Sequence, residues 1–294
     1  MIEIDIVCPI YHELDSLKKL YESYFLQSNV KINRVVFPYT LSDDEKENEE
    51  FHSFFKEKGI HYFDVKKEEF SHSLTREKAI RDYCVSNIVI MMSQDIVLTN
   101  DMVFYNLVRS IDSHESVYNY ARQVCKYKRS IERYIRERNY PKESHFVSKE
   151  DIEKMQIMAF FSSDACSAYN REIFIKLGGY QGYDVMMNED QLYSKVILEA
   201  GYKKKYCGDA IVEHSHKYTL KQLYRRYYQA GVFYSTTKLF EGYKNTDAGK
   251  SLAFYILKQA LKHFNIPVLL RWLPDMASRY LGIKKGKKEG LKQK

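Results

Sequence analysis

The first hundred residues alternate between short apolar runs and longer segments whose apolar residues recur at helical spacing. The predicted strands are residues 4–10, 33–39, 61–65 and 87–92, and the predicted helices between them are residues 14–26, 42–59 and 73–85. The second of these helices begins with acidic residues and ends at a glycine, Gly59, as helices often do. Strands that alternate with helices predict an α/β fold with a parallel sheet and right-handed crossovers.

The fourth predicted strand, IVIMM, is followed directly by Ser93, Gln94 and Asp95. A continuous apolar run is typical of a strand buried on both faces, and ligands of open α/β sheets bind at the carboxyl ends of such strands. Asp95 therefore stands where a binding site is expected. The simpler alternative is that Asp95 opens a turn or caps a helix near Asn100, and this stretch alone favours neither.

The middle of the chain has a different pattern. Residues 120–145 are highly charged and are interpreted as a helical insertion, at about 120–150, which Pro141 interrupts. The elements expected after it are a strand at 161–170, a helix that ends at Gly178, a helix at 188–201, a strand at 209–216 and a helix at 220–231. We expect a domain of residues 1–235 followed by a basic, amphipathic helical segment, 236–294.

The basic residues are concentrated in this last segment. The chain carries a net charge of +7, and residues 244–294 hold 12 basic and three acidic residues. Two apolar stretches, 252–261 and 266–276, lie beside a run rich in lysine, with Trp272 in the second. Such a segment favours a surface that lies on an anionic membrane, and no apolar run approaches the roughly 18 residues needed to span one. The alternatives are an ordinary helical cap and unselective binding of nucleic acid.

Several common classes of protein are excluded or disfavoured. No GxGxxG follows the first strand and no GxxxxGK[ST] occurs, which argues against dinucleotide oxidoreductases and P-loop enzymes. The five cysteines are scattered without a CxxC pair, so we expect reduced thiols rather than a zinc site or disulfides. The first residues, MIEIDIV, resemble a strand and not a signal peptide, and we expect a cytoplasmic protein.

Acidic residues and histidines recur at the ends of the predicted strands and at one helix start. Asp95 closes a strand, Glu189 and Asp190 open a helix, and His214 and His216 close a late strand. A carboxylate and an imidazole can bind Mg²⁺ or Mn²⁺ when a diphosphate supplies further oxygens. A second, unliganded carboxylate can then take a proton from an attacking hydroxyl group.

Taken together and in this order, these motifs resemble the family 2 glycosyltransferases of GT-A fold. The resemblance rests on PIYHE (9–13), SQD (93–95), NED (188–190) and HSH (214–216). It is closer to the bacterial rhamnosyltransferase branch, through FSHSLTRE (70–77), YARQ (120–123), NYP (139–141) and the segment 213–231. It covers residues 4–235 and implies a Rossmann-like, mostly parallel sheet flanked by helices, with a helical C-terminal appendage.

On the nucleotide side, the resemblance implies that Pro9, Tyr11 and Glu13 line the nucleoside pocket and that Arg76 faces the nucleotide. Thr40 falls near the serine that reads the base in most of the family, although the loop around it differs. For Pro9 and Tyr11 the alternative is packing at a strand end, and for Arg76 it is a place on a helix surface.

Asp95 matches the last acid of the family's DxD motif, a metal ligand, with Gln94 before it. Ser93 replaces the first acid, which leaves fewer charged ligands. His216, or less favourably His214, matches a later metal-contacting histidine.

On the reaction side, the resemblance implies that Asp190 is the catalytic base and Glu189 its neighbour. The alternative is that both acids only favour a helix N-terminus. Arg122 and Asp164 are candidates for contacts with the acceptor or the transferred sugar.

The expected function is an inverting transfer of L-rhamnose from dTDP-β-L-rhamnose to a hydroxyl group of a lipid-linked saccharide, with Mn²⁺ or Mg²⁺, at the inner face of the cell membrane. A UDP-hexose donor is the nearest alternative. A non-catalytic module that binds a membrane or nucleic acid is another, and a glycoside hydrolase would pair carboxylates without a nucleotide or metal. We expect no specific nucleic acid partner, and the sequence indicates no oligomeric state.

Overall fold

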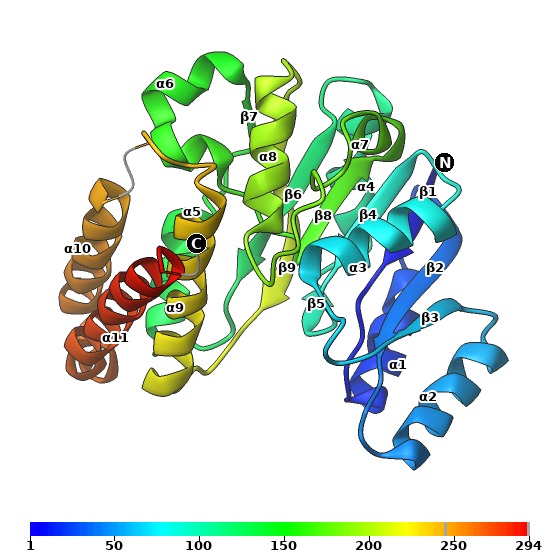
Figure 1. Cartoon of the computed structure of the whole chain (residues 1–294), viewed down its shortest axis with the longest axis horizontal. Coiled ribbons are helices and arrows are strands. Elements are labelled where there is room, and N and C mark those ends of the chain that lie inside the picture. The colour runs from blue at the N-terminus through cyan, green and yellow to red at the C-terminus, as the bar shows by residue number, and fades with distance from the viewer. Residues whose placement is uncertain (244–245, 293–294) are drawn as a thin grey trace.

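The computed structural model describes residues 1–243 and 246–292, and within them the chain builds one mixed β-sheet flanked by helices (Figure 1). The strands in sheet order are β3 (His61–Val65), β2 (Val30–Thr40), β1 (Ile2–Val7), β4 (Ile88–Met92), β8 (Cys166–Asn170), β6 (Tyr118–Val124), β9 (Lys204–His214) and β5 (Ile96–Leu98), and β7 (His145–Val147) pairs with β9. The helices that matter below are α1 (Leu14–Tyr24), α2 (Glu45–Glu57), α3 (His72–Lys78), α4 (Val103–Asp112), α5 (Ile131–Asn139), α7 (Arg171–Lys176), α8 (Glu189–Glu199), α9 (Leu220–Thr237), α10 (Thr246–Lys262) and α11 (Ile266–Gly290).

The first four strands are parallel, as the alternating pattern predicts. In β4, Ile88, Ile90 and Met92 pack into the core under α1, α2 and α4. Val89 and Met91 point the other way, into the core under α7 and α8. The strand is buried on both faces, which confirms the interpretation of its continuous apolar run.

The prediction of a helix from residue 120 is wrong. Residues Tyr118–Val124 form β6, which lies between β8 and β9 inside the sheet. Its residues alternate as a strand requires, since Tyr118 and Tyr120 lie in aromatic clusters on one face while Asn119 is buried on the other. Only the following stretch is helical, as α5, so an insertion that begins near residue 120 is also wrong at its start.

The C-terminal helix α11 packs along α9. Three glycines of α11 face α9. Gly282 lies against Tyr224 and Tyr228, Gly286 against Tyr228 and Val232, and Gly290 against Val232 and Ser235. Because these contacts advance along both helices together, α9 and α11 run in the same direction. The glycines allow the two backbones to approach closely. The lysine-rich run expected at the chain end is therefore the last part of a docked helix, and its residues 293 and 294 lie outside the described residues.

Figure 1 shows α9, α10 and α11 together on one side of the sheet, away from α1 and α2. In residues 1–243 and 246–292, no helix combines the length and the apolar character that crossing a membrane requires. The five cysteines are free thiols, as expected from their spacing.

Candidate active site

The ends of several strands meet at one edge of the sheet. β1, β4, β6 and β9 run in the same direction, so their carboxyl ends share that edge. β8 runs the other way and begins there, with the amide of Ser93 donating to the carbonyl oxygen of Ala165 at 2.9 Å. The residues that follow β4 and β6 and those that precede β8 are thus neighbours although they are far apart in the sequence.

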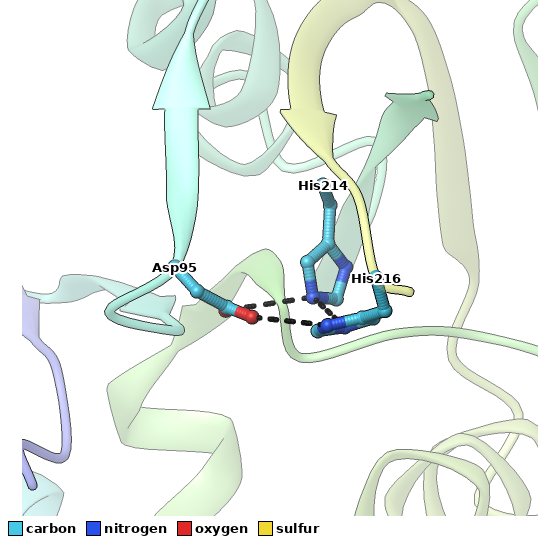
Figure 2. Close-up of side chains that lie close together, drawn as sticks. All are labelled: Asp95, His214 and His216. Atoms are coloured by element: carbon cyan, nitrogen blue, oxygen red, sulfur yellow. Dashed lines mark hydrogen bonds and ion pairs between the residues drawn. The ribbon is translucent and has the colours of Figure 1, made fainter. Parts of the chain in front are cut away.

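Asp95, His214 and His216 come together at this edge (Figure 2). The carboxylate oxygens of Asp95 lie 3.5 Å from Nε2 of His214 and 3.5 Å from Nδ1 of His216. The two imidazoles meet through their Nε2 atoms at 2.8 Å. Asp95 is half exposed, so the three side chains form a cluster open to solvent. The structure brings both histidines of the His-x-His motif to the carboxylate, where the sequence favoured His216 alone.

The protonation of these side chains suits metal binding. Burial acts against the negative charge of Asp95, but the proximity of His214 and His216 outweighs it and lowers the pKa of Asp95 to about 2. Burial and the neighbouring His214 lower the pKa of His216 to about 4. At neutral pH the cluster therefore offers a carboxylate and a neutral imidazole, the forms that bind a cation.

Gln123, near the end of β6, orients the imidazole of His214. Its Oε1 accepts a hydrogen bond from Nδ1 of His214 at 2.8 Å, and its Nε2 donates to Oγ of Ser163 at 2.7 Å. Because Nδ1 of His214 carries the proton, Nε2 has its lone pair free and faces Asp95. Sequence reasoning missed this residue, although it is the last letter of the YARQ motif.

The loop after β1 is held against this edge by Gln94. The amide of Tyr11 donates to Oε1 of Gln94 at 2.9 Å, and Nε2 of Gln94 donates to the carbonyl oxygen of His12 at 2.6 Å. His12 and Glu13 both have positive φ angles, 57° and 61°, which are uncommon for residues other than glycine. Gln94 thus positions the proposed nucleoside loop through its backbone, and the Tyr11 ring stays exposed.

Thr40 lies next to the same loop. Its amide donates to the carbonyl oxygen of Ile10 at 2.9 Å, and the amide of Ile10 donates to Pro38 at 2.8 Å. The end of β2 therefore lies beside Pro9 and Tyr11, as a pocket formed by both would require.

Asp190 lies in the first turn of α8, which follows Asn188 with a φ of 63°. The carboxylate is partly exposed and accepts a hydrogen bond from the amide of Gln191 at 2.7 Å. Burial and the negative charge of Asp164 raise the pKa of Asp190 to about 7. A carboxylate of this kind is poised to take a proton near neutral pH.

Asp164 lies behind Asp190 and is itself buried, with 3% of its surface exposed. Its oxygens accept hydrogen bonds from Ser167 at 2.7 Å, from Tyr169 at 2.6 Å and from Tyr118 at 2.9 Å. These hydroxyl donors satisfy the carboxylate, so its role in this structure is electrostatic. A contact of Asp164 with the acceptor or the transferred sugar stays a prediction.

Glu189 and Arg76 form a buried ion pair between α8 and α3. Nε of Arg76 is buried and has no partner among the residues that the structure describes. The pair fixes the start of α8, and hence Asp190, against the element that follows β3. Glu189 is thereby paired with Arg76, and a contact of Glu189 with the acceptor stays a prediction.

Two further cations border the reaction side. Arg122 in β6 keeps a buried Nε that finds no acceptor in the described part of the chain. Lys204 in β9 is buried and donates to the carbonyl oxygen of Phe161 at 2.6 Å, and burial lowers the pKa of Lys204 to about 7. Lys204 stands in a run of three lysines that is typical of a surface, so no sequence signal could have identified it.

The arrangement separates two chemical tasks at one edge of the sheet. Asp95, His214 and His216 offer one carboxylate oxygen and two imidazole nitrogens within 4.8 Å of one another, a donor set that can hold a divalent cation and whose imidazoles favour Mn²⁺ over Mg²⁺. Asp190 offers a base. No hydrogen bond or ion pair joins Asp190 to this cluster within residues 1–243 and 246–292.

Comparison with known proteins agrees with this geometry. The chain is 30% identical to the O-antigen chain rhamnosyltransferase RfbN of Salmonella typhimurium, over 78% of this chain and 74% of the relative. It is 30% identical to the O-antigen chain rhamnosyltransferase WbaN of Salmonella anatum, over 74% and 70%. No family model matches the chain.

Solved structures share the fold. A mannosyltransferase from Pyrobaculum calidifontis, in complex with GDP-mannose and Mn²⁺, has a TM-score of 0.61 at 13% identity, over 99% of this chain and 87% of that one. TarS of S. aureus with UDP-GlcNAc has a TM-score of 0.56 at 11% identity, over 99% and 91%. Both structures share the sheet and the flanking helices of this chain, and the fold class expected from the sequence is confirmed.

Proposed function

The chain belongs to the rhamnosyltransferases of glycosyltransferase family 2, and from this premise we propose that it transfers L-rhamnose from dTDP-β-L-rhamnose to a hydroxyl group of a lipid-linked saccharide. The two Salmonella relatives are O-antigen chain rhamnosyltransferases, which supports an acceptor of the O-antigen type. The observation that carries the proposal is the cluster of Asp95, His214 and His216 at the sheet edge that also bears Asp190. A non-catalytic module would need neither.

The donor is proposed to bind between the loop after β1 and the end of β2. Pro9, Tyr11 and Glu13 come from the first and Thr40 from the second, and Gln94 holds the loop at the end of β4. The exposed Tyr11 ring offers a face on which a base can stack. Arg76 is proposed to contribute a charge to the nucleotide side through its unpaired Nε.

Asp95, His214 and His216 are the residues that would hold a divalent cation. When bound, such an ion neutralises the negative charge that develops on a diphosphate leaving group. Ser93 replaces an acid in the motif, and in this chain two histidines stand beside Asp95 as further ligands. Gln123 keeps His214 in the form that binds.

Asp190 is proposed to act as the general base. Its carboxylate takes the proton of the acceptor hydroxyl group while the acceptor oxygen forms a bond to the anomeric carbon of rhamnose. The bond from that carbon to the diphosphate oxygen breaks, and dTDP leaves with the electron pair. A single displacement without an enzyme nucleophile inverts the anomeric configuration.

A donor-binding panel tests this assignment. The ligands are dTDP, dTDP-rhamnose, UDP, UDP-glucose and GDP, each with and without Mn²⁺, in thermal-shift measurements on the wild type and on Asp95→Ala. A ligand at a hundredfold excess over its dissociation constant stabilises the folded state by about 2.7 kcal/mol. We expect the dTDP compounds to stabilise the wild type with Mn²⁺ and to lose most of this effect in Asp95→Ala. Stronger stabilisation by the UDP compounds would instead identify a UDP-hexose enzyme.

We further propose that α10 and α11 hold the protein on the inner face of the cell membrane. Ile266, Leu270 and Leu273 lie on one face of α11 and are 56%, 77% and 68% exposed. Phe264, before α11, is 85% exposed, and the exposed lysines of both helices suit anionic lipids.

Vesicle co-sedimentation tests this location. We expect Leu270→Glu/Leu273→Glu to lose binding to phosphatidylglycerol vesicles. The matched control, Phe25→Glu/Leu26→Glu, changes two exposed apolar residues at the end of α1 and should bind like the wild type. Equal binding of all three proteins would rule out this surface.

A further inference from the structure

A cavity of about 670 Å³ opens beside His216, and no residue of the proposed donor loop lines it. One wall is the loop Lys126–Ser130 between β6 and α5, a second is the loop His216–Thr219 between β9 and α9, and the third is the face of α11 that carries Arg271 and Arg279. Because His216 belongs both to this lining and to the metal-ligand cluster, the cavity begins where that cluster ends.

The cavity is strongly basic. Its cationic lining residues are Lys126, Lys128, Arg129, Lys217, Arg271 and Arg279, and its acidic ones are Glu132 and Asp275. Both acids are already neutralised within the protein, since Glu132 pairs with Arg136 at 2.7 Å and Asp275 with Arg279 at 2.5 Å. The cavity therefore holds a surplus of positive charge.

Three of these cations have no anionic partner in the described residues. Lys128, Arg129 and Lys217 make no ion pair there and are exposed, although Lys217 lies 4.4 Å from the centre of the Tyr127 ring. Uncompensated cations that converge on one cavity repel one another unless an anion binds between them. Arg and Lys together are the side chains that bind phosphate groups.

The surrounding backbone has the same polarity. α5 and α9 both begin at the cavity wall, capped by Ser130 and Thr219, so the positive ends of two helix dipoles face it. The third wall, α11, carries on its outer face the exposed apolar residues Ile266, Leu270 and Leu273. The cavity thus lies between a metal-ligand cluster and an apolar surface.

We propose that this cavity binds the diphosphate group of the acceptor lipid. The inference rests on the proposed function, since it assigns a subsite to the lipid-linked acceptor of that reaction. A diphosphate bound to Lys128, Arg129 and Lys217 leaves the lipid chain to follow the apolar face of α11 and the saccharide to extend toward the sheet edge. The donor diphosphate then binds on the other side of the cluster of Asp95, His214 and His216.

The first experiment measures binding of inorganic diphosphate by calorimetry, in EDTA and without donor. Metal-dependent binding at the donor site is thereby suppressed. We expect Lys128→Ala/Arg129→Ala to bind diphosphate about tenfold more weakly than the wild type. The control, Lys46→Ala/Lys56→Ala, removes the same charge from exposed positions of α2 and should bind within about twofold of the wild type. Equal weakening in both variants, or in neither, would overturn the proposal.

The second experiment separates the acceptor from other sources of phosphate. For a synthetic prenyl-diphosphate-linked monosaccharide, Lys128→Ala/Arg129→Ala should raise the acceptor KM and leave the donor KM unchanged. When the same sugar is carried on a neutral alkyl chain, the variant and the wild type should have the same KM for this acceptor. A rise in the donor KM of this variant would assign the cavity to the donor. If the variant lost binding to phosphatidylglycerol vesicles as strongly as it lost binding to diphosphate, the cavity would be assigned to lipid headgroups. Either result overturns the proposal.

The two proposals fail separately. The calorimetric measurement contains neither nucleotide nor metal, so an error in the proposed donor does not alter its result. The donor panel, in turn, does not depend on Lys128 or Arg129.

Discussion

Nδ1 of His214 lies 2.8 Å from Oε1 of Gln123, and this hydrogen bond turns the other nitrogen of the ring toward Asp95. Gln123 is buried and is held in turn by Ser163. Strand β6 therefore supports the metal-ligand cluster through Gln123, although the charged pattern of this segment predicts a helix.

Gln123→Ala is expected to weaken Mn²⁺ binding by about 10- to 100-fold, because His214 loses the acceptor that fixes its tautomer and its orientation. Gln123→Glu keeps an acceptor oxygen for Nδ1 of His214 at the same place and should retain most of the affinity. Titration of Mn²⁺ followed by electron paramagnetic resonance measures both. Equal affinity of the wild type and Gln123→Ala would show that the hydrogen bond does not matter for the metal.

The rate of transfer should depend on pH through Asp190. The ionised form is the base, and its pKa is raised to about 7, so kcat/KM is expected to rise about tenfold per pH unit below 7 and to level off above it. Lys204 titrates in the same range. Asp164→Asn distinguishes the two, because it removes the charge that raises the pKa of Asp190 and should move the inflection to lower pH. An inflection that stays in place would assign the pH dependence to another group.

Asp190 should also make the protein less stable as the pH rises. Between about 4 and 7 the folded state keeps the proton on Asp190 and the unfolded state has released it, so the free energy of unfolding falls across this window. At pH 8 the folded wild type must hold the negative charge of Asp190 in a buried place, and Asp190→Asn removes this charge. The variant is therefore expected to be more stable than the wild type at pH 8 by about 1–3 kcal/mol. At pH 4 the difference should nearly vanish. Urea denaturation at both pH values measures it.

The glycines of α11 should be intolerant of side chains. A Cβ atom at Gly286 would overlap the carbonyl oxygen of Tyr228 in α9, so Gly286→Ala is expected to cost about 1–3 kcal/mol in the free energy of unfolding. Gly249 of α10 has open space around it, and Gly249→Ala should stabilise by up to about 1 kcal/mol. Thermal denaturation distinguishes the two, and similar melting temperatures would contradict the observed packing of α9 on α11.

The parallel half of the fold and the position of Asp95 could be predicted because each depends on local pattern. The run Ile88–Met92 is apolar at every position, as is typical of a strand buried on both faces. The strand β6 could not be recognised so easily, since the charged residues after it extend the polar pattern. The alternation of side chains between the two faces of β6 begins at Tyr118, two residues before the segment 120–145 for which the sequence predicts a helix.

The parts of the site that the sequence did not indicate are those made by distant pairs. Arg76 and Glu189 are 113 residues apart, and nothing local in either segment shows that they form a buried ion pair. The sequence makes Asp164 a candidate for contact with the acceptor or the transferred sugar, but it does not show that the hydroxyl groups of Tyr118, Ser167, Tyr169 and Tyr180 enclose it. Contacts of this kind follow from the register of the sheet, which the sequence did not specify.

The most direct test of the account is single-turnover transfer of rhamnose by Asp190→Asn, with donor binding measured on the same sample. The account predicts that binding of dTDP-rhamnose with Mn²⁺ is unchanged and that the rate of transfer falls by about 100-fold or more, because the acceptor hydroxyl group has lost its base. Full transfer activity in Asp190→Asn would contradict the assignment of the reaction to this edge of the sheet.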